Sequence, residues 1–114
     1  MNLQVFHNPR CSKSRAALKY LDEKGIKYDT ILYLKDNPDF KQLKEIIDKL
    51  NIKPLDLIRK KEKIFTTTYK GQNLTDDEWI QVMVDNPVLI ERPVVFNEAK
   101  AVVGRPVELI DELL

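Results

Sequence analysis

The 114-residue sequence has only one cysteine, Cys11, and one histidine, His7. A single cysteine cannot form an internal disulfide, so the sequence does not call for an oxidising compartment. One thiol and one imidazole are also too few for a plausible set of metal ligands. We therefore expect neither a structural disulfide nor a metal site.

Long apolar runs and an excess of one charge are also missing. No run approaches the roughly 20 apolar residues of a membrane span, and the opening residues MNLQVFHNPR lack the layout of a signal peptide. Lysine plus arginine (19) and aspartate plus glutamate (18) nearly cancel, so total charge gives no reason to expect nucleic acid or a membrane as partner. We expect a cytoplasmic monomer in which any electrostatic function depends on local clusters.

The first third of the chain has the pattern of a strand-helix-strand unit. The apolar run LQVF (3–6) predicts a buried strand that ends at a loop, and a helical pattern follows from Ser12 to a stop at Gly25. The β-branched and aromatic residues of KYDTILYL (27–34) predict a second strand. The whole is the size of a βαβ unit.

A helical middle and a β-rich end follow. Asn37 as N-cap before Pro38 predicts a helix that continues to about residue 50. Further helices are expected over 55–61 and over 106–114. A capping box from Thr75 to Glu78 predicts another helix that begins there. A hairpin is expected over 93–104. This order predicts an α/β, thioredoxin-like fold with a mixed four-stranded sheet. We expect one domain, 1–114, with a helical insertion at about 38–90.

The segment FHNPRCSKSR (6–15) places Cys11 where the first strand's loop meets the first helix. Cations and helix N-termini lower a thiol's pKa, and Arg10, Lys13 and Arg15 surround this thiol in sequence. The same features bind oxyanions. A lone cysteine is more often a small buried residue without chemistry, but three cations within four residues disfavour a core position.

Two common cysteine motifs are excluded by single positions. A C-x-x-C redox pair would need a second thiol at Ser14, and a C-x5-R phosphatase loop would need an arginine at Ala17. The remaining possibility is a single thiolate whose adduct is resolved by an external thiol.

Three distant arginines have distinctive contexts: Arg59 in DLIRKKE, Arg92 in IERPVVF and Arg105 in VVGRPVE. A residue before proline favours extended backbone, so Arg92 and Arg105 are expected to project from strand ends. Guanidinium groups suit the binding of a tetrahedral oxyanion. The alternative is that these arginines are solvated surface residues without a function.

These segments resemble the glutaredoxin-coupled arsenate reductase (ArsC) family, which also contains the Spx-type regulators. The resemblance lies in HNPRCSKSR, LIRKKE, NPVLIERPVV and VVGRPVE, spread over nearly the whole chain in family order. These versions are most similar to a branch usually named arsenate reductase by similarity. Two positions depart from the pattern: Phe6 replaces the usual tyrosine, and Arg10 is larger than its counterpart in dedicated resistance enzymes.

The resemblance implies a site and a reaction. Cys11 would be the nucleophile that attacks arsenate, and the oxyanion would be bound by Arg59, Arg92 and Arg105. His7 and Ser14 would help to lower the thiol's pKa, and Pro93 would be the cis-proline before the third strand. Glutathione and the partner glutaredoxin would supply the reducing equivalents, with no bound cofactor.

Two other functions stay open at this stage. The protein could be an ArsC-like thiol oxidoreductase with another substrate. It could also be an Spx-like regulator that binds RNA polymerase, although Ser14 removes the C-x-x-C switch common in those regulators.

Overall fold

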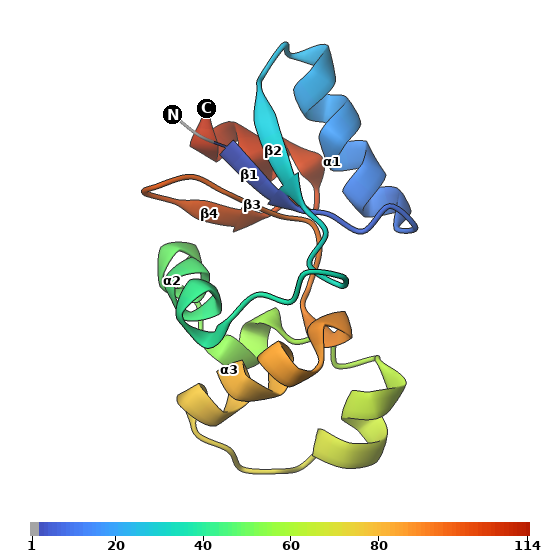
Figure 1. Cartoon of the computed structure of the whole chain (residues 1–114), viewed down its shortest axis with the longest axis vertical. Coiled ribbons are helices and arrows are strands. Elements are labelled where there is room, and N and C mark those ends of the chain that lie inside the picture. Colours follow the sequence, from blue (N-terminus) through green and yellow to red (C-terminus); the bar gives the residue numbers. More distant parts are fainter. Residues whose placement is uncertain (1–2) are drawn as a thin grey trace.

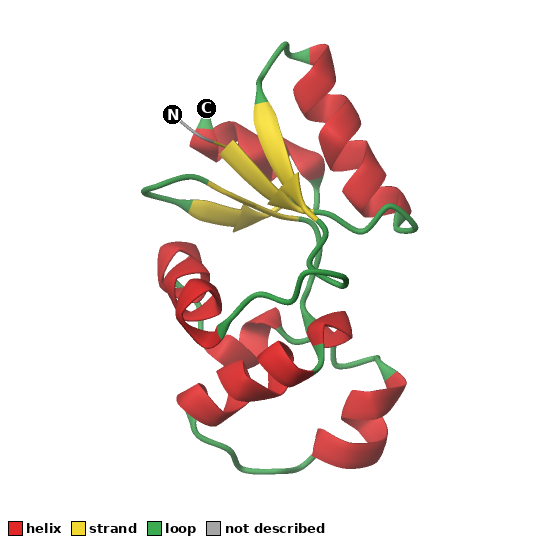
Figure 2. Cartoon of the chain, viewed as in Figure 1, coloured by secondary structure: helices red, strands yellow, loops and turns green. Residues whose placement is uncertain are grey.

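A computed structural model describes residues 3–114, and its centre is a four-stranded sheet in the order β2-β1-β3-β4 (Figure 1, Figure 2). Strand β1 (Leu3–Phe6) is parallel to β2 (Tyr28–Ile31) and antiparallel to β3 (Val94–Phe96). Strand β4 (Ala101–Val103) pairs antiparallel with β3. The mixed four-stranded sheet flanked by helices confirms the predicted α/β class.

One face of the sheet packs against the first and last helices. Successive strand residues point to opposite faces, and Leu3, Val5 and Val95 share a buried cluster on this face. Helix α1 (Ser12–Glu23) and the 3₁₀ helix η4 (Val107–Leu113) complete the cluster.

The other face is covered by the chain segment between β2 and β3, in which one helix packs on the sheet and a second packs behind it. Phe6 and Phe96 point into a second cluster, to which α2 (Phe40–Leu50) and α3 (Asp76–Asp85) contribute. Figure 1 shows these two helices on the side of the sheet away from α1. Burial on both faces explains why β1 and β3 are almost continuously apolar.

The start of α2 differs from the prediction. The helix begins at Phe40, and its N-cap is Asp39, whose carboxylate accepts a hydrogen bond from the Gln42 N–H at 2.7 Å. Asn37 was therefore the wrong cap, and Pro38 lies before the helix. The Asp39 carboxylate thus pairs one of the N–H groups that the first turn of the helix leaves without an intrahelical partner.

The helix expected over 55–61 was also wrong. A single 3₁₀ turn, η1 (Pro54–Leu57), is followed by Ile58, which forms an isolated antiparallel bridge with Ile90. The segment leaves the helical pattern because this bridge uses extended backbone. The sequence also did not predict the π turn at Phe65–Tyr69 or the 3₁₀ turn at Pro87–Leu89.

Other local predictions are confirmed. Thr75 and Glu78 form the reciprocal capping box of α3, and β3 and β4 form the predicted hairpin. Gly25 has a φ of 69°, the left-handed conformation expected after the end of α1. Within residues 3–114, no helix is long and apolar enough to cross a membrane.

Candidate active site

The register of the sheet gathers several loop segments at one end. Phe6, the last residue of β1, pairs with Ile31 at the end of β2 and with Val94 at the start of β3. Val94 also pairs with Val103 at the end of β4. The residues after β1, β2 and β4 and those before β3 therefore meet at the same end (Figure 1).

Cys11 occupies the N-cap position of α1, in extended conformation. Its N–H donates to the Asn8 carbonyl at 3.0 Å, and its carbonyl accepts from the Arg15 N–H at 3.0 Å. The thiol is partly exposed. It thus lies where the first N–H groups of a helix have no intrahelical partner.

His7 and Ser14 support the loop from inside. Their side chains are buried and joined by a 2.6 Å hydrogen bond between Nδ1 and Oγ. The same Oγ accepts from the Asn8 N–H at 3.0 Å. Burial, and then the charge of Arg15, lowers the pKa of His7. A neutral His7 therefore acts on this loop through hydrogen bonding rather than through charge.

The pKa of Cys11 is lowered by a balance of opposing effects. Burial raises it, but the backbone N–H groups of Ser14 and Lys13 and the side chain of Arg92 lower it by more. The Arg92 guanidinium contributes both a hydrogen bond and its charge. The lowered pKa is typical of a reactive thiol at a helix N-terminus.

The cations close to Cys11 in sequence have less effect on its pKa than expected. The side chains of Arg10, Lys13 and Arg15 are exposed, and the Arg15 guanidinium donates to the Pro9 carbonyl at 2.8 Å. The charge that acts on Cys11 comes instead from an arginine 81 positions away, which the pairing of β1 with β3 brings to the loop.

Arg92 is placed by the backbone that enters β3. The Arg92–Pro93 peptide bond is cis, as the resemblance implied. The Pro93 carbonyl accepts from the Gly104 N–H at 2.8 Å. A Cβ at Gly104 would lie 3.3 Å from the Pro93 ring, so a glycine permits this close approach.

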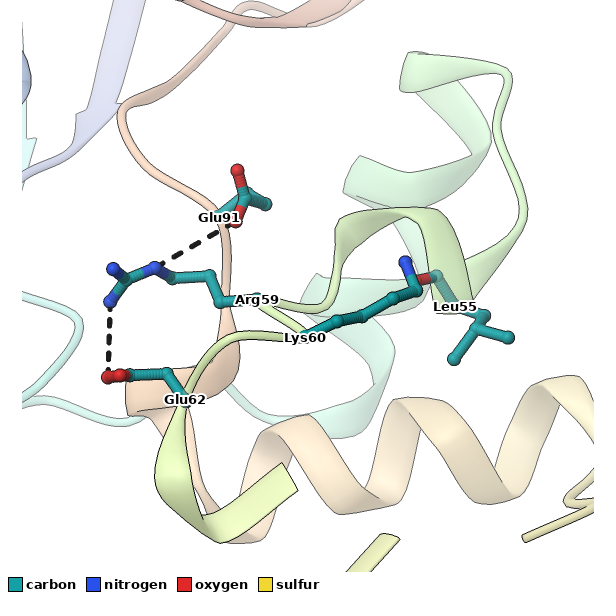
Figure 3. Close-up of polar contacts among 5 residues, drawn as sticks. All are labelled: Leu55, Arg59, Lys60, Glu62 and Glu91. Atoms are coloured by element: carbon teal, nitrogen blue, oxygen red, sulfur yellow. Dashed lines mark hydrogen bonds and ion pairs between the residues drawn. The ribbon is translucent and has the colours of Figure 1, made fainter. Parts of the chain in front are cut away.

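Arg59 is held by two carboxylates (Figure 3). Its NH1 lies 3.3 Å from Glu62 Oε1, and its Nε lies 3.8 Å from Glu91 Oε1. Its backbone N–H donates to the Leu89 carbonyl at 2.7 Å, just beyond the Ile58 bridge. The next residue, Lys60, points away and donates to the Leu55 carbonyl.

Arg105 is exposed and lies on the rim of an open hollow of about 450 Å³. Arg59 and Glu91 line the same hollow, with two further lysines. The structure thus brings Arg92 directly to Cys11 and places Arg59 and Arg105 together around the hollow. Within residues 3–114, no group of three or more histidine, cysteine, aspartate or glutamate side chains could hold a metal ion.

The ArsC family model matches residues 6–113. The chain belongs to the ArsC family. It is 41% identical over 114 residues to a Neisseria meningitidis (serogroup A) protein named arsenate reductase, covering 98% of this chain and 97% of that one. It is 38% identical to Escherichia coli K12 YfgD, named an uncharacterized protein, over 98% and 96% of the two chains. A solved structure titled arsenate reductase from Vibrio cholerae superposes with a TM-score of 0.95 at 36% identity, covering 100% of this chain and 98% of that one.

Three residues at the site of this ArsC protein were not singled out from the sequence. Glu62 and Glu91 pair with Arg59, and Tyr33 is buried beside the loop that carries Cys11. Tyr33 appeared only as one residue of a predicted strand. The register of β1 with β2, had it been known, would have placed Tyr33 next to that loop.

The lowered pKa of this ArsC thiol predicts the pH dependence of its alkylation. Because the thiolate persists at lower pH, the iodoacetamide rate should reach half its maximum at a lower pH in the folded protein than for an ordinary thiol. The same protein unfolded in urea provides the control and should give the ordinary midpoint. Equal midpoints for folded and unfolded protein would contradict a stabilised thiolate.

Proposed function

We propose that this protein is an arsenate reductase in which Cys11 attacks arsenate and reduction is completed by glutathione and glutaredoxin. One observation carries the proposal: the only cysteine has a lowered pKa and faces Arg92 at the N-terminus of α1. The names of the Neisseria and Vibrio relatives support arsenate as the substrate.

The proposed anion site combines backbone and side-chain donors. Arsenate oxygens would bind the N–H groups of the first turn of α1 and the guanidinium groups of Arg59, Arg92 and Arg105. Arg92 is already beside the thiol, whereas Arg59 is paired with Glu62 and Glu91. An incoming oxyanion therefore competes with these carboxylates for Arg59.

The proposed chemistry begins without a change in oxidation state. The Cys11 thiolate forms a bond to arsenic, and one arsenic oxygen leaves as water after protonation, which gives a thioarsenate ester. Glutathione then displaces a second arsenic oxygen, which leaves as water, and the glutaredoxin thiol attacks the glutathione sulfur to give a glutathione–glutaredoxin mixed disulfide. The two external thiols thereby lose two electrons and two protons, and arsenic(V) becomes arsenic(III). Water then cleaves the sulfur–arsenic bond, so that arsenite leaves and Cys11 returns as the thiolate.

Further proposals concern the setting of the reaction. With no second cysteine, the protein depends on external thiols, which favours the cytoplasm, where thiols are kept reduced. We propose that the chain works as a monomeric single domain, with the helical segment at about 38–90 as an insertion and without a bound cofactor. His7 and Ser14 support the loop, and cis-Pro93 presents Arg92.

A second candidate is a thiol oxidoreductase that acts on another substrate. It is favoured by the general nature of the site, since N–H groups and guanidiniums bind any tetrahedral oxyanion. The E. coli relative YfgD, at 38% identity, has a name that states no substrate. Kinetics on several oxyanions would separate the two candidates.

The proposed function is tested by an omission experiment. Arsenite formation from arsenate should require the protein, glutathione and glutaredoxin together, and should fall to background when any one is left out. Mass spectrometry should detect Cys11 carrying both arsenic and glutathione when glutaredoxin is omitted. Background turnover in the complete mixture would refute arsenate reduction, and full turnover without glutaredoxin would refute the proposed reductant.

A further inference from the structure

Tyr33 lies at the end of the sheet that carries Cys11, two residues after the end of β2. Its N–H donates to the Ile31 carbonyl at 3.0 Å, and the His7 N–H donates to the same carbonyl at 2.9 Å. Its ring stacks on Phe6, with centroids 5.5 Å apart and planes at 22°. The side chain is completely buried. Backbone bonding and stacking therefore hold the phenol in a fixed orientation.

The Tyr33 hydroxyl is buried, and its hydrogen has no acceptor among residues 3–114, although Arg92 lies close enough to act on the hydroxyl oxygen as a donor. The buried Nε–H of Arg92 likewise has no acceptor among these residues. Proteins pair nearly all buried polar atoms, because leaving one unpaired is unfavourable. Two buried donors close to the nucleophile therefore lack an acceptor, which is the condition expected of donors that bind an anion.

The charged groups that affect the pKa of Tyr33 show which residues lie near its hydroxyl. Burial raises the pKa of Tyr33 and the charge of Cys11 raises it further, while the charges of Arg92 and Arg59 and a hydrogen bond from Arg92 lower it. Burial lowers the pKa of Arg92, but a hydrogen bond to Cys11 and the charges of Cys11 and Tyr33 outweigh it, so the net shift is upward. The hydroxyl is thus within electrostatic reach of the thiol and of two guanidinium groups, and it is protonated near pH 7.

We propose that Tyr33 binds the substrate by donating a hydrogen bond from its hydroxyl to an oxygen of the oxyanion held at Cys11. Arg92 Nε would donate to the same anion. The identity of the anion as arsenate rests on the proposed function, whereas the position of the donor does not. Because the hydroxyl has almost no exposed surface, this contact requires neighbouring side chains to shift when the anion binds.

The test compares Tyr33→Phe with a matched control, Tyr28→Phe. Tyr28 lies on β2, and its hydroxyl donates at the surface to Asp22 at 2.8 Å. Arsenate, and separately inorganic phosphate, is titrated for its protection of Cys11 against iodoacetamide. Tyr33→Phe should raise the half-protecting concentration about ten-fold or more, as expected for a lost hydrogen bond to a charged group. Tyr28→Phe should leave it unchanged.

A second measurement separates substrate binding from a structural role. The urea midpoint of Tyr33→Phe should equal or exceed that of the wild type, because the variant loses a buried hydroxyl whose hydrogen has no acceptor among residues 3–114. Unchanged protection would overturn the inference. Weaker protection together with a lower midpoint would also overturn it, since the hydroxyl would then support the fold.

The outcomes for Tyr33 and for the proposed function are distinguishable. If anions protect wild-type Cys11 in a Tyr33-dependent way but arsenate is not reduced, the proposed function fails and the inference holds. If arsenate is reduced but Tyr33→Phe has wild-type protection and KM, the inference alone fails. If neither anion protects the wild type, the inference fails as well.

Discussion

Replacing Cys11 with serine should abolish arsenate reduction while leaving the fold intact. Serine supplies no thiolate to attack arsenic, so the arsenic adduct to which glutathione adds cannot form. The nearby His7 is no ready base for a hydroxyl, because its Nδ1 is already bonded to Ser14. We expect turnover to fall by at least about 10³-fold, as for removal of other enzyme nucleophiles. Arsenite formation in the complete mixture measures this loss.

The control for Cys11→Ser is a measurement of the variant's stability against urea. Cys11 is the N-cap of α1 and makes no side-chain cap hydrogen bond. Serine is a preferred N-cap, and a side-chain cap contributes about 1 kcal/mol to stability. The urea midpoint of the variant should therefore match or exceed that of the wild type. Retained arsenate turnover in a folded variant would remove Cys11 from the mechanism.

Replacing Arg92 with glutamine should weaken the site in two separate ways. The Cys11 pKa should rise, because the thiolate loses both the hydrogen bond and the charge of Arg92, so the alkylation midpoint moves to higher pH. The value of kcat/KM for arsenate should fall about 10²–10³-fold, as for the removal of one donor from an oxyanion site. Alkylation profiles and initial rates measure the two effects.

Lys44→Gln is the matched control for the loss of one positive charge. Lys44 is a surface residue of α2 that pairs with Asp77 at 3.5 Å. If the effect of Arg92 is local, Lys44→Gln should keep the wild-type alkylation midpoint and kcat/KM. Equal shifts in the two variants would mean that overall charge, rather than the position of Arg92, sets the pKa of Cys11.

The sequence correctly predicted helix ends that depend only on a few neighbouring residues. The capping box of Thr75 and Glu78 and the stop at Gly25 need only neighbouring residues, and both were predicted. The start of α2 was missed because Asn37 and Asp39 are both acceptable caps by residue type. Which of them bonds a helical N–H depends on where the rest of the chain places the first turn.

The larger errors in the sequence-based predictions arise from pairing between segments that are far apart in the chain. The 55–61 segment has helical spacing, yet a bridge to Ile90 keeps Ile58 extended. The charge on Cys11 was expected from its sequence neighbours, yet it comes from Arg92 through the β1–β3 register. Tyr33 and the carboxylates beside Arg59 become visible only when that register is known.

The central position of β1 has a consequence for synthesis of the chain. β1 is made first, but one of its two neighbours, β3, lies about ninety residues later. During translation Cys11 emerges long before Arg92, and the β3 side of β1 has no strand to pair with until residue 96 is made. The ribosome-bound chain therefore carries a thiol without the guanidinium that stabilises its thiolate, and Cys11 reaches its final reactivity only after Arg92 and β3 have been made.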